Sequence, residues 1–479
     1  MQNQTMINIR REESFLLLLL FVIAAGIRLV PEILAYPYPI GYDVINYYLP
    51  VLSNYENYWP MVSTQFPLYV ILLHEIIIGT DLSPNVVVPL AAILIYGFFS
   101  ISVYTVSRSI FRLERDGSLF LSLFVIFQTS LLRTAWDLHK DMLSLTTMLF
   151  AISLGLSGRY LSKTVFLVVF TLCIFSVLTD RMIGLLLIAT VITYALLRRG
   201  KKDLVLSGVI SLVYVVAILN GIHEIEINIQ NVASGETKSI SYKQLNLIIL
   251  FIVTSGLLIP FGIIGFIRSP KTILKIPLFV SLVGSLSWII YPSNSSLLPD
   301  RWTFIFSIFL AIFAAYGIVI LIKKRRAYKF RNHRLYFFVV LAPCMTAGIL
   351  YATTSANVAL SLFSAFHDYV GQFGPISMQA NSISIEESKS IVVAIDCINH
   401  RTPLSSVIVI DKHWRGWTEL ELKNRSFLFY EGLDKLEAQR KSFYLLSFTN
   451  TSIPEFEDAR VLLVYKNNNF LLHKMSFDN

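Results

Sequence analysis

The run from residue 15 to residue 30 reads FLLLLLFVIAAGIRLV and contains a single charged residue, Arg28. A helix needs about 20 apolar residues to cross the hydrocarbon core of a bilayer, so this run with its flanks predicts a membrane-spanning helix. Arg10 and Arg11 precede it, as in a secretory signal peptide, but no small-residue cleavage site follows. We therefore expect a retained first helix.

Similar apolar runs recur along the first three quarters of the chain. Of the 479 residues, 55% are hydrophobic and 15% are charged, whereas roughly 25% of the residues of a soluble globular protein are charged. This composition excludes a single water-soluble enzyme and predicts an all-α polytopic membrane domain. We predict about eleven transmembrane helices, at residues 15–30, 84–106, 118–133, 141–156, 164–180, 182–197, 203–220, 244–267, 276–291, 301–322 and 335–355.

The basic residues predict how the chain is oriented in a cell membrane. With a cytoplasmic N-terminus, 21 of the 28 Lys and Arg in residues 1–360 fall in cytoplasmic loops, as the positive-inside rule requires. An odd number of spans then leaves the C-terminal segment extracytoplasmic. Basic loops next to anionic lipid headgroups also account for the net charge of +9, so we expect no nucleic-acid partner.

The predicted organisation is a membrane domain over 1–360 and a small extracytoplasmic α/β domain over 361–479. Within the first, residues 35–83 form one long external loop, and structured loops of that length are usually functional. The apolar stretch 66–78 is too short to span and is expected to lie at the outer interface as a helix. In the second domain we expect strands at 406–410, 427–430, 443–448, 460–465 and 470–473, and helices near 385–399 and 432–441.

Ionisable residues gather at the predicted external ends of the spans. Such groups near hydrocarbon are costly and usually face a partner or a water-filled cavity. Four separate helix pairs present acid and base to the same side. The sets are Arg28 with Gly41-Tyr42-Asp43 and Asn46-Tyr47-Tyr48, the segment 133–141 (RTAWDLHKD), Asp180-Arg181, and Asp300-Arg301.

Each set has more than one interpretation. If the second set is helical, Arg133, Asp137 and Asp141 share one stripe, where the carboxylates either bind a divalent metal, accept a proton or neutralise the arginine. Asp43 has no basic residue within ten positions and is either a loop cap or a functional carboxylate. The external arginines either reach lipid headgroups or pair with another helix, or they bind an anionic substrate.

This layout resembles the GT-C class of membrane glycosyltransferases, which use sugars linked to a polyprenyl phosphate such as dolichyl phosphate. The points of similarity are Arg28 at the end of the first helix, Gly41-Tyr42-Asp43 in a long external loop, the interfacial Phe66-Pro67, the 133–141 segment, Arg301 at the start of a late Ala- and Gly-rich helix, and a segment at 385–417 like the C-terminal domain of archaeal members.

The resemblance implies an enzyme that moves a hexosyl or pentosyl group to a lipid-linked glycan or a protein acceptor, with inversion, in protein glycosylation or the cell envelope. The reaction needs a carboxylate that takes the proton of the acceptor hydroxyl, help worth roughly 10²–10⁴-fold in rate, and cations that hold the phosphate. We assign the base to Asp43 and expect catalytic roles for Asp137 and Asp141. The same three carboxylates are the expected ligands of a possible Mg²⁺ or Mn²⁺. The expected substrate-binding residues are Arg28, Tyr42, Tyr47, Arg133, His139, Lys140, Arg181 and Arg301.

Two departures and two rival functions remain. The first loop has one acidic residue where many members have a pair, and the WWDYG motif of oligosaccharyltransferases is absent, since residues 413–417 read HWRGW. Transfer of a single sugar is therefore favoured over sequon glycosylation. A polymerase or ligase of surface polysaccharide would show similar hydropathy. A flippase or transporter of lipid-linked sugars would need charges near the bilayer midplane, often in two repeated halves, which the sequence lacks.

Overall fold

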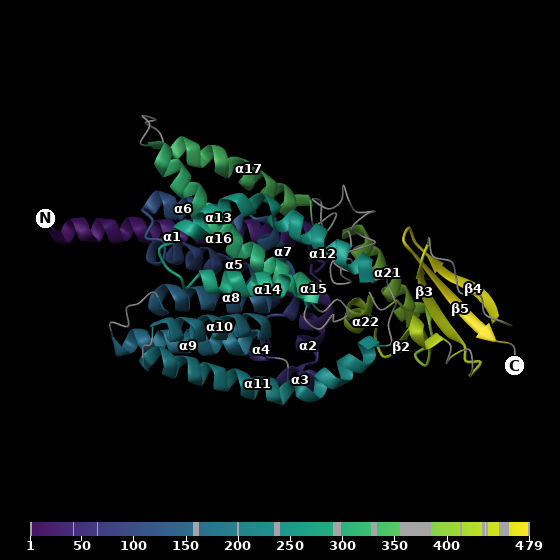
Figure 1. The fold of residues 1–479 in the computed structure, drawn as a ribbon. Helices are drawn as coiled ribbons and strands as arrows, with labels where there is room; N and C mark the ends of the chain where they lie inside the picture. The colour runs from purple at the N-terminus through teal and green to yellow at the C-terminus, as the bar shows by residue number, and fades with distance from the viewer. Residues whose placement is uncertain are drawn as a thin grey trace.

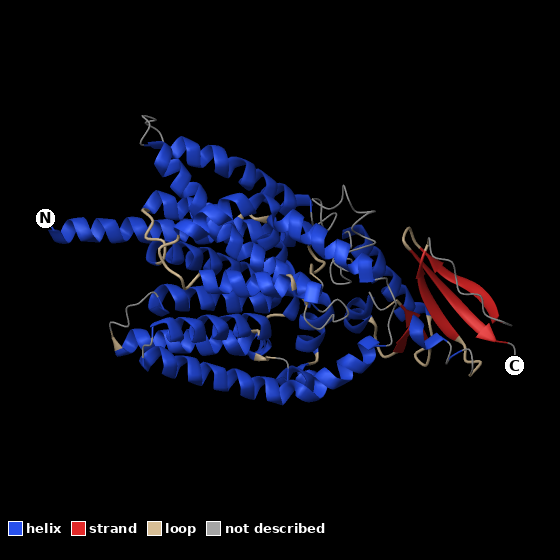
Figure 2. Ribbon diagram, viewed as in Figure 1, coloured by secondary structure: helices blue, strands red, loops and turns tan. Residues whose placement is uncertain are grey.

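The computed structural model describes residues 2–41, 43–64, 66–156, 162–198, 201–233, 240–290, 298–326, 333–354, 385–411, 414–433, 436, 439–449 and 459–477. Its helices run side by side in a bundle, and its strands are confined to a small domain at one end (Figures 1 and 2). The N-terminus lies at the opposite end of the bundle. We call the end of the bundle next to the strands the sheet-facing end.

The bundle is built from α1 and from α5 to α17, and a loop of short helices joins α1 to α5. The bounds are α1 (Gln2–Ala35), α5 (Pro84–Ser109), α6 (Arg115–Ile126), α7 (Thr129–Asp137), α8 (His139–Ala151), α9 (Lys163–Thr179), α10 (Arg181–Arg198), α11 (Lys201–Ala233), α12 (Ile240–Ser255), α13 (Ile259–Arg268), α14 (Lys275–Ser285), α15 (Ser287–Ile290), α16 (Pro299–Arg326) and α17 (His333–Thr354). The loop contains the π-helical turn η1 (Val44–Tyr48), α2 (Leu49–Ser53), α3 (Tyr55–Thr64) and α4 (Leu68–Thr80).

Within the described residues, five helices are long and apolar enough to cross a membrane. A sixth span results if α6 and α7, which meet at 60°, are counted together. The chain is thus a multi-pass membrane protein. Each of the eleven predicted spans coincides with one helix or with consecutive helices, but several are shorter than a bilayer requires, so the count of eleven stays a prediction.

Helix α16 lies at the centre of the bundle and is the most buried of the spans, with 83% of its most apolar window enclosed. It packs against α6, α12, α13 and α14. Small residues such as Ala311, Ala314 and Ala315, all buried, let neighbouring helices approach closely. The first turn of α16 carries Asp300 and Arg301, so these two residues stand on the most firmly packed helix.

The small domain is a mixed α/β unit, as the sequence predicted. It contains α21 (Ile385–Arg401), α22 (Arg415–Glu421) and the strands β1 (Val407–Ile410), β2 (Ser426–Phe429), β3 (Phe443–Phe448), β4 (Ala459–Lys466) and β5 (Phe470–Phe477), which form a five-stranded sheet of order β2-β1-β3-β5-β4. Strand β1 is parallel to β2 and β3, whereas β5 is antiparallel to β3 and β4. All five predicted strands are present. Helix α22 was not predicted, and the helix expected at 432–441 falls partly outside the described residues.

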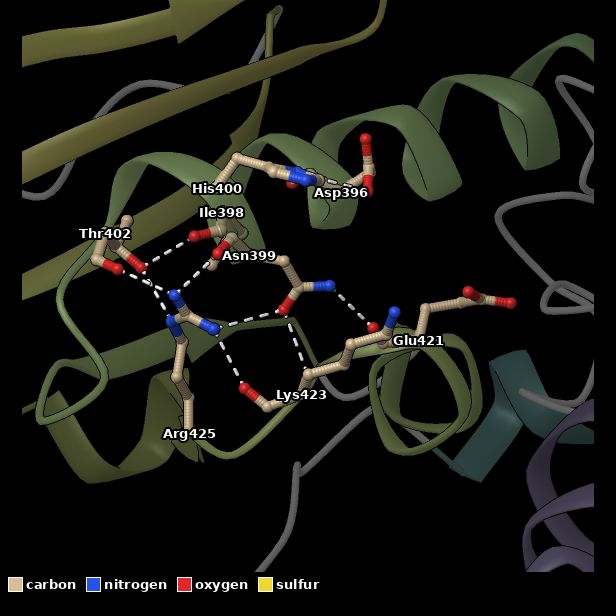
Figure 3. A network of polar contacts seen from close by, with 8 residues as sticks. All are labelled: Asp396, Ile398, Asn399, His400, Thr402, Glu421, Lys423 and Arg425. Atoms are coloured by element: carbon tan, nitrogen blue, oxygen red, sulfur yellow. Dashed lines mark hydrogen bonds and ion pairs between the residues drawn. The ribbon is translucent and has the colours of Figure 1, made fainter.

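Local chemistry explains two features of this domain. In the turn between β4 and β5, the side-chain oxygen of Asn467 accepts hydrogen bonds from the backbone N–H groups of Asn469 and Phe470. At the end of α21, where helix carbonyls lack intrahelical partners, the guanidinium of Arg425 donates to the carbonyl oxygens of Asn399 and Thr402 (Figure 3). Arg425 therefore ties the start of β2 to the C-terminal end of α21.

Candidate active site

Asp43 and Arg301 meet at the sheet-facing end of the bundle. An Asp43 Oδ2 lies 3.6 Å from an Arg301 guanidinium nitrogen, and the two side chains are 19% and 29% exposed. At that distance the contact is an ion pair but not a close hydrogen bond. The pair is therefore accessible, and its contact is long enough that an anionic ligand can replace Asp43 as the partner of Arg301.

Gly41 explains why Asp43 reaches this position. Its φ is +103°, and a methyl group on its Cα would collide with the carbonyl oxygen of Trp136 and touch Asp137. Glycine has no Cβ and adopts positive φ at little cost. The loop backbone therefore lies directly on the end of α7, and Asp43 follows two residues later.

The segment 133–141 is not one continuous helix. Leu138 has φ −97° and ψ 58°, which ends α7 before α8 begins, so the expected stripe of Arg133, Asp137 and Asp141 is interrupted. Arg133 and Asp137 form a buried ion pair within α7. Asp141 is instead buried after the break and interacts electrostatically with Asp180, Arg301 and Lys140.

Two cations join these acidic groups into one cluster. The ammonium of Lys140 lies 5.0 Å from the ring centre of Tyr47 and interacts electrostatically with Asp43, Asp141 and Asp180. Arg301 interacts with the same three carboxyl groups and with Asp300. Residues from the four sets found in the sequence therefore meet. Asp180 and Asp300 were not among the predicted site residues, and the signal for both was their place beside an arginine at the predicted external end of a span.

Two of the buried polar atoms at the cluster have no hydrogen-bond partner in the described part of the chain. They are the hydroxyl of Tyr48 and Oδ2 of Asp141. Buried polar atoms in folded proteins are almost always hydrogen-bonded. These atoms therefore mark positions where the hydroxyl groups of a ligand, or water, can bind.

His139 is enclosed and has both ring nitrogens engaged. Its Nδ1 lies 3.2 Å from the hydroxyl of Tyr69, and its Nε2 lies 3.0 Å from the carbonyl oxygen of Trp136. Since a carbonyl only accepts, Nε2 donates and Nδ1 accepts. The ring also stacks on Tyr48 in η1, with centroids 5.4 Å apart. In this arrangement His139 holds η1 against the start of α8.

Three other predicted substrate-binding residues are buried in another contact, exposed, or outside the described residues. Arg28 has no exposed surface; its Nε donates to the carbonyl oxygen of Ala135 at 3.1 Å, and its guanidinium pairs with Glu32 at 2.7 Å. It therefore joins α1 to α7 instead of reaching headgroups. The side chain of Arg181 is exposed. Tyr42 lies outside the described residues.

The expected metal ligands do not converge. Asp43 faces Arg301, Asp137 faces Arg133 and Asp141 faces Asp180. In the described ranges no three His, Cys, Asp or Glu side chains are grouped so that they could hold a metal ion. The three carboxylates Asp43, Asp137 and Asp141 thus do not fit as the ligand set of Mg²⁺ or Mn²⁺, because each already faces another protein group.

An apolar groove of about 1130 Å³ begins at Phe304, one helical turn after Arg301 on α16. It lies between α6, α7, α12, α13, α16 and α17, with Arg133 and Tyr351 at one end and Lys324 and Tyr336 at the other. Along α16 its lining extends from Phe304 to Lys324, about 30 Å at 1.5 Å per residue. This length equals the thickness of the hydrocarbon core of a bilayer.

Arg28→Met should lower stability because it leaves Glu32 without its partner and breaks the contact with α7. Removing one member of a buried ion pair costs about 3–5 kcal/mol, which thermal unfolding in detergent would detect as a clear drop in melting temperature. Arg181→Met, at an exposed side chain, is the matched control. Unchanged stability of the Arg28 variant together with lost substrate binding would contradict the structural role.

The fold was also compared with known proteins. No family model matches the sequence, and no curated protein matches it. Among solved structures, ArnT from Cupriavidus metallidurans bound to undecaprenyl phosphate aligns with a TM-score of 0.55 and 12% identity, over 95% of this chain and 97% of ArnT. The apo form of the same protein aligns equally well, over 97% of this chain and 98% of ArnT.

A third structure is archaeal oligosaccharyltransferase AglB from Archaeoglobus fulgidus, in complex with an inhibitory peptide and a dolichol-phosphate. It aligns over 91% of this chain and 70% of its own, with 13% identity and a TM-score of 0.46. At such identities similarity concerns the fold and does not transfer an activity. The ArnT alignments cover nearly all of both chains, so this protein shares its fold with ArnT, as the resemblance to the GT-C class implied.

Proposed function

We propose that this protein is a membrane glycosyltransferase that moves a sugar from a polyprenyl-phosphate donor to a lipid-linked or protein acceptor at the extracytoplasmic face. One observation carries the proposal. The Asp43–Arg301 pair stands at the end of the bundle where an apolar groove, as long as the hydrocarbon core, also ends. A lipid-linked sugar needs this combination of an apolar channel for its tail and charged groups for its head.

Arg301 and Lys140 are the proposed ligands of the donor phosphate. Arginine can make two parallel hydrogen bonds to a phosphate, and lysine adds a point charge beside it. In this scheme the phosphate replaces Asp43 as the partner of Arg301. Donor binding thus releases the Asp43 carboxylate at the moment when a base is needed, and Arg301 then stabilises the charge of the leaving phosphate.

Asp43 is the proposed general base. It removes the proton of the acceptor hydroxyl, the acceptor oxygen attacks the anomeric carbon, and the bond between that carbon and the phosphate oxygen breaks, which inverts the configuration. Asp141 and Asp180, with the hydroxyl of Tyr48, would bind hydroxyl groups of the sugar. Asp137 would act by holding Arg133 at the mouth of the groove.

A second candidate function, a flippase of lipid-linked sugars, is favoured by one observation. Cations stand at both ends of the groove, Arg133 at one end and Lys324 at the other. The acid–base cluster at one end alone favours chemistry over transport. Reconstituted vesicles distinguish them, because a flippase moves a labelled lipid-linked sugar between leaflets without altering it, whereas a transferase releases polyprenyl phosphate.

Asp43→Asn should reduce the rate of transfer from a polyprenyl-phosphate sugar by about 10²–10⁴-fold, which is the usual contribution of a general base to the rate. Donor affinity should stay near that of the wild type, because the amide keeps the shape of the side chain. The measurement is release of polyprenyl phosphate by purified protein. Asp81→Asn, at the C-cap of α4, is the matched control. Full turnover in the Asp43 variant would reject the assignment of the base.

Arg301→Ala should raise the KM for the donor by tenfold or more, since one charge-assisted contact to phosphate is worth about 1.5–3 kcal/mol. Arg268→Ala in α13, exposed and at the other end of the bundle, should leave it unchanged. Donor titrations against the rate of transfer measure both. If the KM of the Arg301 variant equals that of the wild type, the arginine does not bind phosphate.

Ala347→Trp tests the groove, because an indole at this position on α17 would fill space that the donor tail needs. The KM for a long-chain donor should rise several-fold, and that for a donor with a short isoprenoid chain should change less. Ile349→Trp, two residues away and exposed outside the groove lining, is the control. Equal KM values for the Ala347 variant and the wild type with the long-chain donor would place the tail elsewhere.

A further inference from the structure

Helix α22 of the small domain packs directly on η1, the turn that follows Asp43. The backbone N–H of Gly416 donates to the side-chain oxygen of Asn46 at 3.0 Å. A methyl group at Gly416 would overlap the carbonyl group of Ile45 and crowd the Cα of Asn46. Two backbones from opposite ends of the chain therefore touch, and glycine is the residue that permits it.

Apolar burial reinforces this contact. Ile45, at 7% exposure, belongs to the same buried cluster as Trp417 in α22, at 2%. The ring of Tyr38, in the loop before Gly41, lies 6.4 Å from that of Trp417 in an edge-to-face arrangement. Burying a large aromatic side chain is worth several kcal/mol. The contact between α22 and the loop is thus a buried part of the folded core and not a superficial contact between two surfaces.

A polar contact extends the same interface to α3. The hydroxyl of Tyr58 in α3 interacts electrostatically with Glu419 and Arg415 of α22, which are themselves joined by a hydrogen bond from Arg415 Nε to Glu419 Oε1 at 2.7 Å. Burial and the Glu419 carboxylate raise the pKa of Tyr58 above its usual value, so the phenol stays protonated. Helix α22 therefore touches the loop before Asp43, the turn after it and α3.

The turn η1 cannot orient Asp43 alone. It is five residues long and begins directly after Asp43, and a single turn of helix has little stability in isolation. On one side His139 and Tyr69 pack against Tyr48. On the other side Ile45 and Asn46 lie under α22. The direction of the Asp43 carboxylate is therefore set by these two supports.

We propose that the small C-terminal domain positions the base: through the contact of Gly416 with Ile45 and Asn46, α22 holds η1 so that the carboxylate of Asp43 faces Arg301. This inference rests on the proposed function of Asp43 and goes beyond it. Gly416 and Asn46 are positioning residues that never touch the substrate. A displacement of about 1 Å at a catalytic group can cost 100-fold in rate, so a loosened contact should appear in kcat.

Gly416→Ala tests the inference in the full-length protein. The matched control is Gly432→Ala in the same domain, where a methyl group would meet nothing closer than the Leu428 side chain at 3.7 Å. A second pair is Asn46→Leu, which removes the acceptor, and Asn46→Asp, which keeps an oxygen for the Gly416 N–H. For each variant, amide hydrogen exchange of residues 43–53 and 414–422 reports docking, and steady-state kinetics with a polyprenyl-phosphate sugar gives kcat and KM.

The expected result is faster exchange in both segments, a 10- to 100-fold lower kcat and a donor KM within twofold for Gly416→Ala and Asn46→Leu. Asn46→Asp should recover most of the rate lost in Asn46→Leu, and Gly432→Ala should behave as the wild type. The proposal is overturned if exchange rises while kcat holds, or if neither changes. A wild-type protein without transfer would defeat the proposed function instead, and the exchange data would still show whether α22 holds η1.

Discussion

Charge compensation at the sheet-facing end of the bundle is the constraint on which the rest of the structure depends. An ionised group withdrawn from water costs several kcal/mol unless an opposite charge and hydrogen bonds compensate it. Arg301 faces Asp43, Arg133 faces Asp137, and Asp141 interacts with Lys140, Asp180 and Arg301. Arg133 and Asp137 lie on one helix, but Arg301 and its partners come from separate parts of the chain, so the helices that carry them must pack with these ends together.

The features that follow from local pattern could be predicted from the sequence. Apolar runs of sufficient length became helices, and alternating stretches bounded by turn residues became the five strands, because both depend on the spacing of neighbours along the chain. The meeting of Asp43 with Arg301 was also predictable in outline. Alternating spans return to the same side of a membrane, so charges at every second connection share one face.

The features that depend on distant contacts could not be predicted. The break at Leu138 separates Asp141 from the stripe of Arg133 and Asp137, and nothing in the local pattern signals it. Arg28 was predicted to bind substrate, with lipid headgroups as the alternative, and its contact with the carbonyl of Ala135 in α7 has no signal in the local sequence. The contact of Gly416 with Ile45, which is far away in sequence, exists only in the folded protein. In each case tertiary packing decides what the local sequence leaves open.

The cluster stands on two elements of different rigidity. Helix α16, which carries Arg301, is rigid, and the turn η1, which follows Asp43, is adjustable. The same helix lines the groove from Phe304 to Lys324 and carries Arg301 in its first turn, so one buried helix sets the distance between the groove and the proposed phosphate ligand. Asp43, by contrast, stands on a short turn held from two sides. A donor of fixed geometry suits the rigid element, and acceptors must enter beside the adjustable one. In the proposed function, a base at this place would let the small domain govern when the carboxylate is aligned without disturbing the donor.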